Sequence, residues 1–267
     1  MNNCVFSAFT ATLGTWLLTA LGSATVLLFK NTKLKLMNLF LGFSAGVMIA
    51  ASFWSLLEPA IEQAEMYSAI PASVVATLGF LSGALFMWLC DRIVCISQKK
   101  LNKNKKALSI GTNRIILLVL SVTLHNIPEG LAVGVAFGAL NRQNVTPEAF
   151  MGAVSIALGI GLQNFPEGAA VSLPLRREGY SKAKSFLIGQ ASGMVEPVGG
   201  VVGALLVMYV TKALPYALSF AAGAMVLVAV HELIPECRKG QRENCYFSTM
   251  GIICGFAVMM FLDVALG

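Results

Sequence analysis

The chain has 267 residues, of which 57% are hydrophobic and 12% charged, and its mean hydropathy is +0.75. A soluble globular domain is about 45–50% apolar and about 25% charged, so the composition excludes that class and indicates an integral membrane protein. The formal net charge of +6 does not indicate a nucleic-acid partner, because the basic residues are spread between apolar segments rather than gathered in one patch.

Apolar segments of about 20 residues, long enough to cross a lipid bilayer, recur along the whole chain. They predict an all-α integral membrane protein with eight transmembrane helices in a single domain over residues 1–267. The expected spans are residues 6–29, 37–58, 70–91, 115–140, 149–173, 184–210, 213–235 and 247–266.

The Lys and Arg residues alternate between loops in a way that predicts the orientation. Seventeen of the 19 fall in alternate loops, and only Arg142 and Lys212 fall in the others. The positive-inside rule then places the basic loops, including loop 92–114, in the cytoplasm and both termini outside. We expect a multi-pass protein of the plasma membrane, which in a prokaryote is the cell inner membrane.

The second span, 37–58, is rich in small residues and contains Met48, a soft sulfur ligand near mid-membrane. Packing in the core is the alternative role for this methionine. Glu58, Glu62 and Glu65 follow the span and predict an acidic outer mouth that would concentrate cations, with an ordinary solvated loop as the alternative.

Spans four and five contain a repeat. Residues 125–133 read HNIPEGLAV and residues 163–171 read QNFPEGAAV, identical at six of nine positions with an offset of 38. Consecutive spans run in opposite directions, so a pseudo-two-fold axis in the membrane plane would relate the copies. Many transporters build a mid-membrane site from such an inverted repeat.

Each copy places ligand-type side chains on one helix face. His125 and Glu129 are four residues apart, as are Gln163 and Glu167, so each pair lies one turn apart on the same side. Neither span contains a Lys or Arg at that depth. Unpaired carboxylates in a dry interior are strongly destabilising unless a cation or protons neutralise them, and we expect a bound cation.

The copies also supply further oxygen ligands. Pro128 and Pro166 lack an N–H, so each frees a carbonyl one turn earlier, and Asn126 and Asn164 add side-chain oxygens. Mixed oxygen and nitrogen ligands without cysteine suit a releasable first-row divalent ion such as Zn²⁺, Fe²⁺ or Mn²⁺.

The sixth and seventh spans carry further polar residues. Glu196, followed by Pro197, is a third mid-membrane carboxylate and allows a second metal position that shares Glu129 and Glu167. His231 and Glu232 lie near the cytoplasmic end of span seven, where they predict an exit position for the ion. A polar helix end with a cap is the alternative for that pair.

Together, HNIPEG, QNFPEG, Glu196-Pro197, HELIPE at 231–236 and SFWSLLEPA at 52–60 resemble the ZIP (Zrt/Irt-like) divalent metal transporters, most closely the GufA-like branch. The resemblance covers essentially the whole chain. It implies uptake of zinc, and also of Fe²⁺, Mn²⁺ or Cd²⁺, into the cytoplasm by a homodimer. No catalytic cofactor is expected, because the metal is the transported substrate.

The resemblance also implies a binuclear centre. The primary site would comprise His125, Glu129, Gln163, Glu167 and Met48. The secondary site would comprise Asn126, Glu129, Asn164, Glu167 and Glu196. Spans one, four, five and six would move as an elevator against spans two, three, seven and eight. Family members often have His at the position of Gln163 and Asp at that of Asn164, so the second site is expected to be weaker here and the metal range broader.

Two other classes of function are considered. An intramembrane metal-dependent hydrolase would use a metal to activate water, but HNIPE has one His where the HExxH motif has two. A metal sensor that does not transport is the second alternative.

Overall fold

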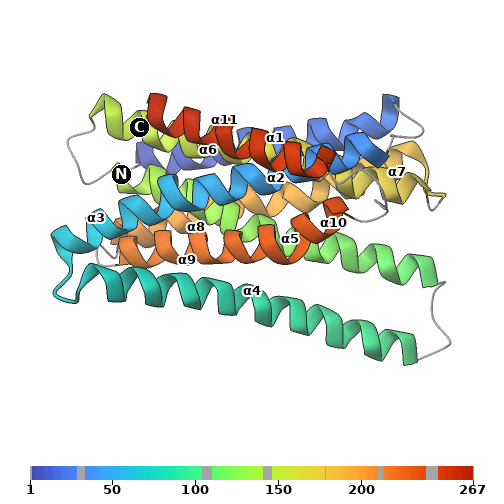
Figure 1. Cartoon of the computed structure of the whole chain (residues 1–267), viewed down its shortest axis with the longest axis horizontal. Helices are drawn as coiled ribbons and strands as arrows, with labels where there is room; N and C mark the ends of the chain where they lie inside the picture. The colour runs from blue at the N-terminus through green and yellow to red at the C-terminus, as the bar shows by residue number, and fades with distance from the viewer. Residues whose placement is uncertain are drawn as a thin grey trace.

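The computed structural model describes residues 2–28, 34–103, 110–140, 146–177, 179–209, 213–238 and 246–266. Within these ranges the chain is helical apart from short turns, and the helices form one elongated bundle (Figure 1). The helices are α1 (Asn2–Leu28), α2 (Leu34–Ala51), α3 (Glu58–Tyr67), α4 (Ala72–Lys103), α5 (Ile110–Ala139), α6 (Pro147–Arg177), α7 (Lys182–Ala191), α8 (Val195–Tyr209), α9 (Leu214–Val228), α10 (Ile234–Arg238) and α11 (Tyr246–Leu266).

Three short segments with other helical geometries interrupt the spans. Two are π-helical, η1 (Ser52–Leu57) between α2 and α3 and η4 (Ala229–Leu233) between α9 and α10. The third is a 3₁₀ turn, η2 (Ser192–Met194), between α7 and α8. π-Helical turns are often found at functional sites, and two of these three segments lie next to predicted site residues.

The all-α membrane fold is confirmed. Among the described residues, seven helical segments are long and apolar enough to cross a membrane. The remaining expected span, 115–140, falls on α5, whose 30 residues make it about 45 Å long. Both chain ends lie at the same end of the bundle (Figure 1), as an even number of crossings requires.

Helical structure continues beyond the ends of two predicted spans. Helical structure continues past span two through η1 and α3 to Tyr67, so Glu58, Glu62 and Glu65 lie on a helix rather than in a loop. The predicted cytoplasmic loop 92–114 is also mostly helical at its ends, because α4 extends to Lys103 and α5 begins at Ile110. Hydropathy locates the membrane core, whereas a helix can continue into water once its first turns are formed.

The spans pack as two groups of helices. In one group, α1 packs along α6 and α5 along α8; in the other, α2 packs along α11 and α4 along α9. Glycines allow these close approaches: a Cβ built at Gly22 would lie 1.9 Å from the carbonyl oxygen of Phe165, and one at Gly223 would lie 1.9 Å from that of Phe80. The groups meet mainly where α2 contacts α6 and α5 contacts α9.

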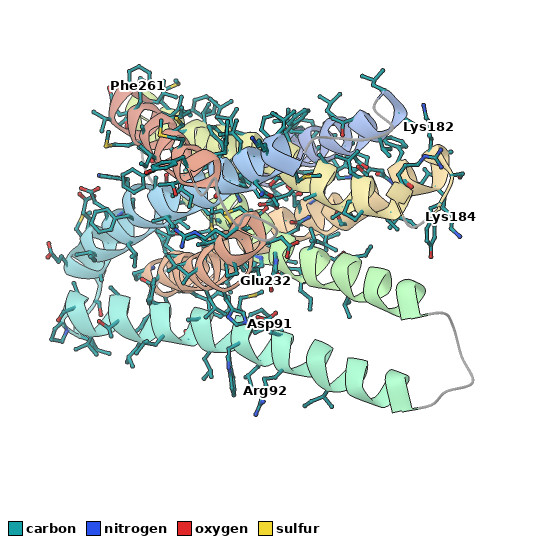
Figure 2. The ribbon with its side chains drawn as sticks, turned by 45° about the vertical axis from the view of Figure 1, so that its right-hand side comes forward. Asp91, Arg92, Lys182, Lys184, Glu232 and Phe261 are labelled. Carbon is teal, nitrogen blue, oxygen red and sulfur yellow. The ribbon has the colours of Figure 1, made fainter. Side chains whose placement is uncertain are left out.

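Charge is distributed unevenly along the bundle. Lys182 and Lys184 lie at one end and Phe261 lies near the other (Figure 2). The described basic residues are Lys35, Arg92, Lys99, Lys100, Lys103, Arg114, Arg176, Arg177, Lys182, Lys184 and Arg238, all within or next to the predicted cytoplasmic loops. The distribution supports the predicted orientation, although Arg142 and Lys212, its two exceptions, lie outside the described residues.

Candidate metal centre

The two copies of the repeat meet inside the bundle. Gln163 Nε2, on α6, donates a hydrogen bond of 2.7 Å to Glu129 Oε1, on α5. Both side chains are fully buried. The asparagine of each copy, Asn126 in the first and Asn164 in the second, is also buried. The local pattern of each helix therefore produces half of a cluster, and packing of α5 against α6 joins the halves.

The glycine of each copy explains how neighbouring helices come so near. A Cβ built at Gly130 would lie 2.4 Å from the carbonyl oxygen of Glu196, and one at Gly168 would lie 2.0 Å from that of Thr19. Thus one copy packs on α8 and the other on α1, in corresponding ways. Both helices remain continuous through Pro128 and Pro166.

Helix α2 approaches the centre from the other group of helices. The Ser44 hydroxyl donates to Glu167 Oε1 at 2.7 Å and lies 3.2 Å from the carbonyl oxygen of Gln163. Met48 is one turn further along α2, on the same face as Ser44, and is fully buried in the hydrophobic core. Its placement is compatible both with the predicted ligand role and with core packing.

Glu196 occupies the first turn of α8, directly after the 3₁₀ turn that breaks span six. Its carboxylate accepts hydrogen bonds from Asn164 Nδ2 at 2.8 Å, from Thr19 Oγ1 at 3.3 Å and from Thr15 Oγ1. Asn126 Nδ2 donates to the backbone carbonyl of Ser192 in the same turn, at 2.9 Å. The sequence did not single out Thr15 and Thr19, since threonine is common in tightly packed membrane helices.

Several buried oxygens in this cluster lack a hydrogen-bond partner among the described residues. They are Asn126 Oδ1, Glu129 Oε2, Gln163 Oε1 and Asn164 Oδ1. Three glutamates, Glu129, Glu167 and Glu196, are buried as well, whereas the described buried residues include no Lys or Arg. Buried acceptors without donors are costly, and a divalent cation would satisfy both the oxygens and the negative charge.

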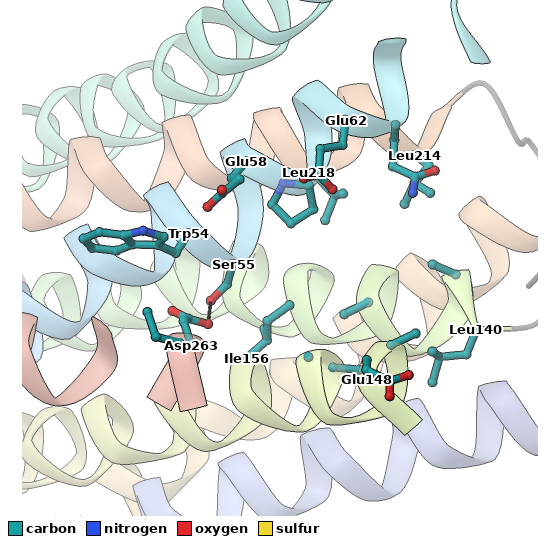
Figure 3. A pocket seen from close by; sticks show the side chains of 18 residues that line it. Trp54, Ser55, Glu58, Glu62, Leu140, Glu148, Ile156, Leu214, Leu218 and Asp263 are labelled. Carbon is teal, nitrogen blue, oxygen red and sulfur yellow. Dashed lines mark hydrogen bonds between the residues drawn. The ribbon is translucent and has the colours of Figure 1, made fainter. Parts of the chain in front are cut away.

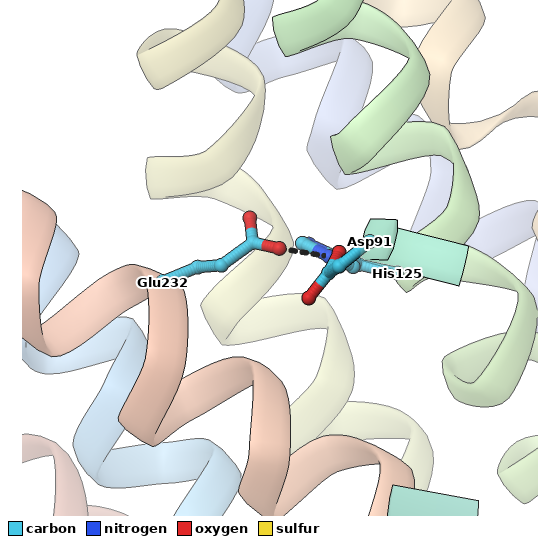
Figure 4. Close-up of side chains that lie close together, drawn as sticks. All are labelled: Asp91, His125 and Glu232. Carbon is cyan, nitrogen blue, oxygen red and sulfur yellow. Dashed lines mark ion pairs between the residues drawn. The ribbon is translucent and has the colours of Figure 1, made fainter. Parts of the chain in front are cut away.

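His125 links this centre to a second cluster. Its Nε2 lies 2.8 Å from Glu232 Oε1, and ligand atoms of Asp91, His125 and Glu232 all lie within 4.8 Å of one another (Figure 4). Such an arrangement could hold a metal ion. Asp91 was not predicted as a site residue, because on the sequence it marks only the polar end of a span.

The two residues of the predicted exit position, His231 and Glu232, have different surroundings in the structure. Within the π-helical segment η4, Glu232 turns toward His125, whereas His231 is exposed. Both line a cavity of about 360 Å³ that also reaches His125, Glu167 and Glu236. The centre is therefore accessible from the half of the bundle that carries the basic residues.

A separate cavity of about 580 Å³ lies toward the opposite end (Figure 3). Four carboxylates line it, from Glu58, Glu62, Glu148 and Asp263, and Ser55 Oγ donates to Asp263 Oδ1 at 2.6 Å. Of the predicted centre residues, none is among the described residues that line this cavity. Of the two cavities, the inner one therefore reaches the centre, and the described lining of the outer one does not include it.

Comparison with known proteins identifies the family. The family model described as ZIP Zinc transporter matches residues 95–263. The chain is 40% identical to Zinc transporter ZIP11 of Xenopus tropicalis, over 98% of each chain. The chain belongs to the ZIP family. The chain is 35% identical to Zinc transporter GufA of Myxococcus xanthus, over 93% of this chain and 94% of that protein. It is 36% identical to Zinc transporter ZIPB of Bordetella bronchiseptica, over 93% of this chain and 78% of that protein.

Membership of the ZIP family confirms the resemblance seen in the motifs of the repeat, of span six and of span seven. It agrees with the prediction that the protein is not an enzyme, since these relatives are named as transporters. The metal-ligand role of each residue stays a prediction. Hydrogen bonds connect several of these residues into one buried cluster.

Proposed function

We propose that this protein moves a divalent metal ion, zinc foremost, across a membrane into the cytoplasm. The ion would bind between α5 and α6, at a centre formed by His125, Asn126, Glu129, Gln163, Asn164 and Glu167. Three curated relatives are named zinc transporters. We assign zinc to this chain as well, because its buried carboxylate, amide and imidazole side chains are suitable ligands for that ion.

The observation that carries the proposal is the buried, uncompensated charge. Glu129, Glu167 and Glu196 are between 0% and 6% exposed, and no Lys or Arg is buried with them in the described part of the chain. Removing carboxylates from water costs several kcal/mol per ion unless a counter-charge is supplied. A protein that kept such a cluster without a cation would lose much of its stability.

The route would run from the acidic outer cavity to the centre and then to the inner cavity. Glu58, Glu62, Glu148 and Asp263 would attract cations from outside. On the inner side, Asp91, His125 and Glu232 would receive the ion before it reaches water. His231 would then act at the mouth of the inner cavity, which is the exit role predicted for it.

Access must alternate, because the inner cavity reaches the centre and the outer one does not. The two groups of helices suggest the moving units: α1, α5, α6, α7 and α8 against α2, α4, α9 and α11. Their boundary is crossed by the Ser44–Glu167 hydrogen bond and the His125–Glu232 contact. An elevator motion would break both polar contacts and expose the ion to the outer cavity.

The ligand types favour a broad set of metals. Carboxylate and amide oxygens suit harder ions such as Mn²⁺, and one imidazole adds affinity for Zn²⁺ and Fe²⁺. Met48, if it reaches the ion, would add affinity for Cd²⁺. Zinc as the main substrate, with Fe²⁺, Mn²⁺ and Cd²⁺ also transported, is the proposed selectivity.

Transport is tested with purified protein in sealed liposomes that contain a zinc-sensitive dye. Wild-type protein should admit zinc, and Glu167→Gln should reduce uptake to the level of empty liposomes. Glu65→Gln is the matched control, because it makes the same chemical change at an exposed position on α3 that is not among the residues lining either described cavity. Metal that binds without entering would contradict transport and favour a sensor. Hydrolysis of a membrane substrate would instead favour a metalloenzyme.

Two further expectations rest on the family resemblance alone. One is that the protein is a homodimer, which native mass spectrometry from detergent micelles would test. The other is a location in the plasma membrane or bacterial inner membrane, which fractionation would test.

A further inference from the structure

Glu196 is held differently from the other buried carboxylates of the centre. Both of its oxygens accept hydrogen bonds: Oε2 from Asn164 and Thr15, and Oε1 from Thr19. Glu196 lies in the first turn of α8. Its carboxylate is therefore held by side chains of α1 and α6.

Glu129 has the opposite character. Its Oε1 accepts one hydrogen bond from Gln163, and its Oε2 has no hydrogen-bond partner among the described residues. A carboxylate offers about four lone-pair positions, so Glu129 keeps most of its capacity for a metal, whereas Glu196 has already used most of its own. Equal burial of the two side chains conceals this difference.

Charge counting leads in the same direction. Two divalent ions carry four positive charges, but the cluster has three carboxylates, those of Glu129, Glu167 and Glu196, because residue 164 is an uncharged Asn. A second ion would leave a net positive charge in a buried site without basic or acidic compensation, which is unfavourable. One ion balances Glu129 and Glu167 and leaves the charge of Glu196, which the hydrogen bonds from Thr15, Thr19 and Asn164 stabilise.

We propose that the centre binds a single divalent ion, on Glu129, Gln163 and Glu167, and that Thr15 and Asn164 are positioning residues that hold Glu196 in place of a second ion. The inference rests on the proposed metal site between α5 and α6. It departs from the binuclear centre that the family resemblance implied. The Asn164 amide donates to Glu196 through Nδ2, and its Oδ1 lacks a partner among the described residues.

The first experiment measures the number of ions directly on the unmodified protein. Zinc-loaded protein is studied by X-ray absorption at the zinc edge, where two metals about 3.5–4 Å apart give a metal–metal scattering contribution. We expect scattering from light ligand atoms without that contribution. A clear metal–metal contribution from wild-type protein would overturn the single-ion centre.

The second experiment counts ions by elemental analysis in protein that has been dialysed against zinc. The count for wild type minus the count for Glu129→Gln/Glu167→Gln removes ions bound elsewhere, such as at Asp91. We expect a difference of one. A difference of two would overturn the inference and leave the proposed site standing, whereas a difference of zero would overturn both. Thermal melting of the double variant verifies that it is folded.

Asn164→Asp tests the charge argument by adding the fourth carboxylate. The same subtraction in the Asn164→Asp background should give two ions instead of one, and the metal–metal contribution should appear. A count that stays at one in this folded variant would show that charge does not limit the site, and the inference would fail.

Thr15 is tested by a pair of variants. Thr15→Val removes a hydroxyl that occupies Glu196 Oε2 and should free Glu196 to bind a metal, so the zinc count after the same subtraction should rise above one. Thr15→Ser keeps the hydroxyl and should keep the count at one. Equal counts in the two variants would overturn the positioning role of Thr15.

Discussion

Gln163 and Glu129 stand in different copies of the repeat and are joined by a hydrogen bond of 2.7 Å between Gln163 Nε2 and Glu129 Oε1. The bond orients the amide so that Gln163 Oε1 is left without a partner among the described residues. In the proposed centre, Gln163 would therefore fix one carboxylate and offer an oxygen, not a nitrogen, to the metal. The pair is the direct contact through which the repeat becomes one site.

Gln163→His should shift the metal preference toward zinc. Imidazole nitrogen binds Zn²⁺ more strongly than an amide oxygen does, whereas Mn²⁺ prefers oxygen. We expect the ratio of zinc to manganese uptake in liposomes to rise by roughly threefold to tenfold. Gln163→Asn, which keeps the amide on a shorter side chain, is the control, and a ratio that changes equally in both variants would argue against ligation by residue 163.

Gly168→Ala should destabilise the protein, because a Cβ at this position would lie 2.0 Å from the carbonyl oxygen of Thr19. Overpacking of this kind costs about 1–3 kcal/mol, and here the obstacle is backbone that cannot rotate away. Gly152→Ala on the same helix is the matched control, since a Cβ there meets no atom within 4 Å. Melting in detergent should be lower only for Gly168→Ala; equal melting temperatures would contradict the close packing of α1 on α6.

Asp91→Asn should slow metal release without removing the central site. Asp91, His125 and Glu232 have ligand atoms within 4.8 Å of one another, and the variant removes one negative charge from that cluster. We expect zinc uptake to fall by about tenfold, while zinc binding at the centre persists. Arg92→Gln is the neighbouring control, because Arg92 points away from the cluster (Figure 2). Unchanged uptake in Asp91→Asn would remove the cluster from the route.

Glu58→Gln combined with Glu62→Gln should raise the KM for zinc at low ionic strength. Both residues line the outer cavity, whose carboxylates would concentrate cations before they bind. The effect should disappear at about 1 M salt, where the screening length is about 3 Å. Glu65→Gln does not alter that lining and should leave the KM unchanged. A KM increase that persists at high salt would indicate direct binding instead of electrostatic attraction.

Local patterns predicted the parts of the protein that depend on local physics. Hydropathy located the spans because a bilayer requires about 20 apolar residues for each crossing. The repeat identified His125, Glu129, Gln163 and Glu167 because polar groups are rare at that depth and a helix places residues four apart on one face. The helix ends were less well predicted, since α3 and the end of α4 lie beyond the apolar segments.

The sequence by itself thus determined the class of protein, and it predicted eight crossings and a set of central polar residues that includes Glu196. Only the tertiary structure decided which side chains contact one another. Thr15 and Asn164 donate hydrogen bonds to Glu196, and Ser44 donates one to Glu167. Asp91 lies close to His125 and Glu232. These partners are 32 to 181 positions apart, and ordinary Thr, Ser and Asp residues carry no signal of such pairing. Helix packing through glycine contacts and π-helical turns brings those side chains together. The local sequence pattern does not predict this packing.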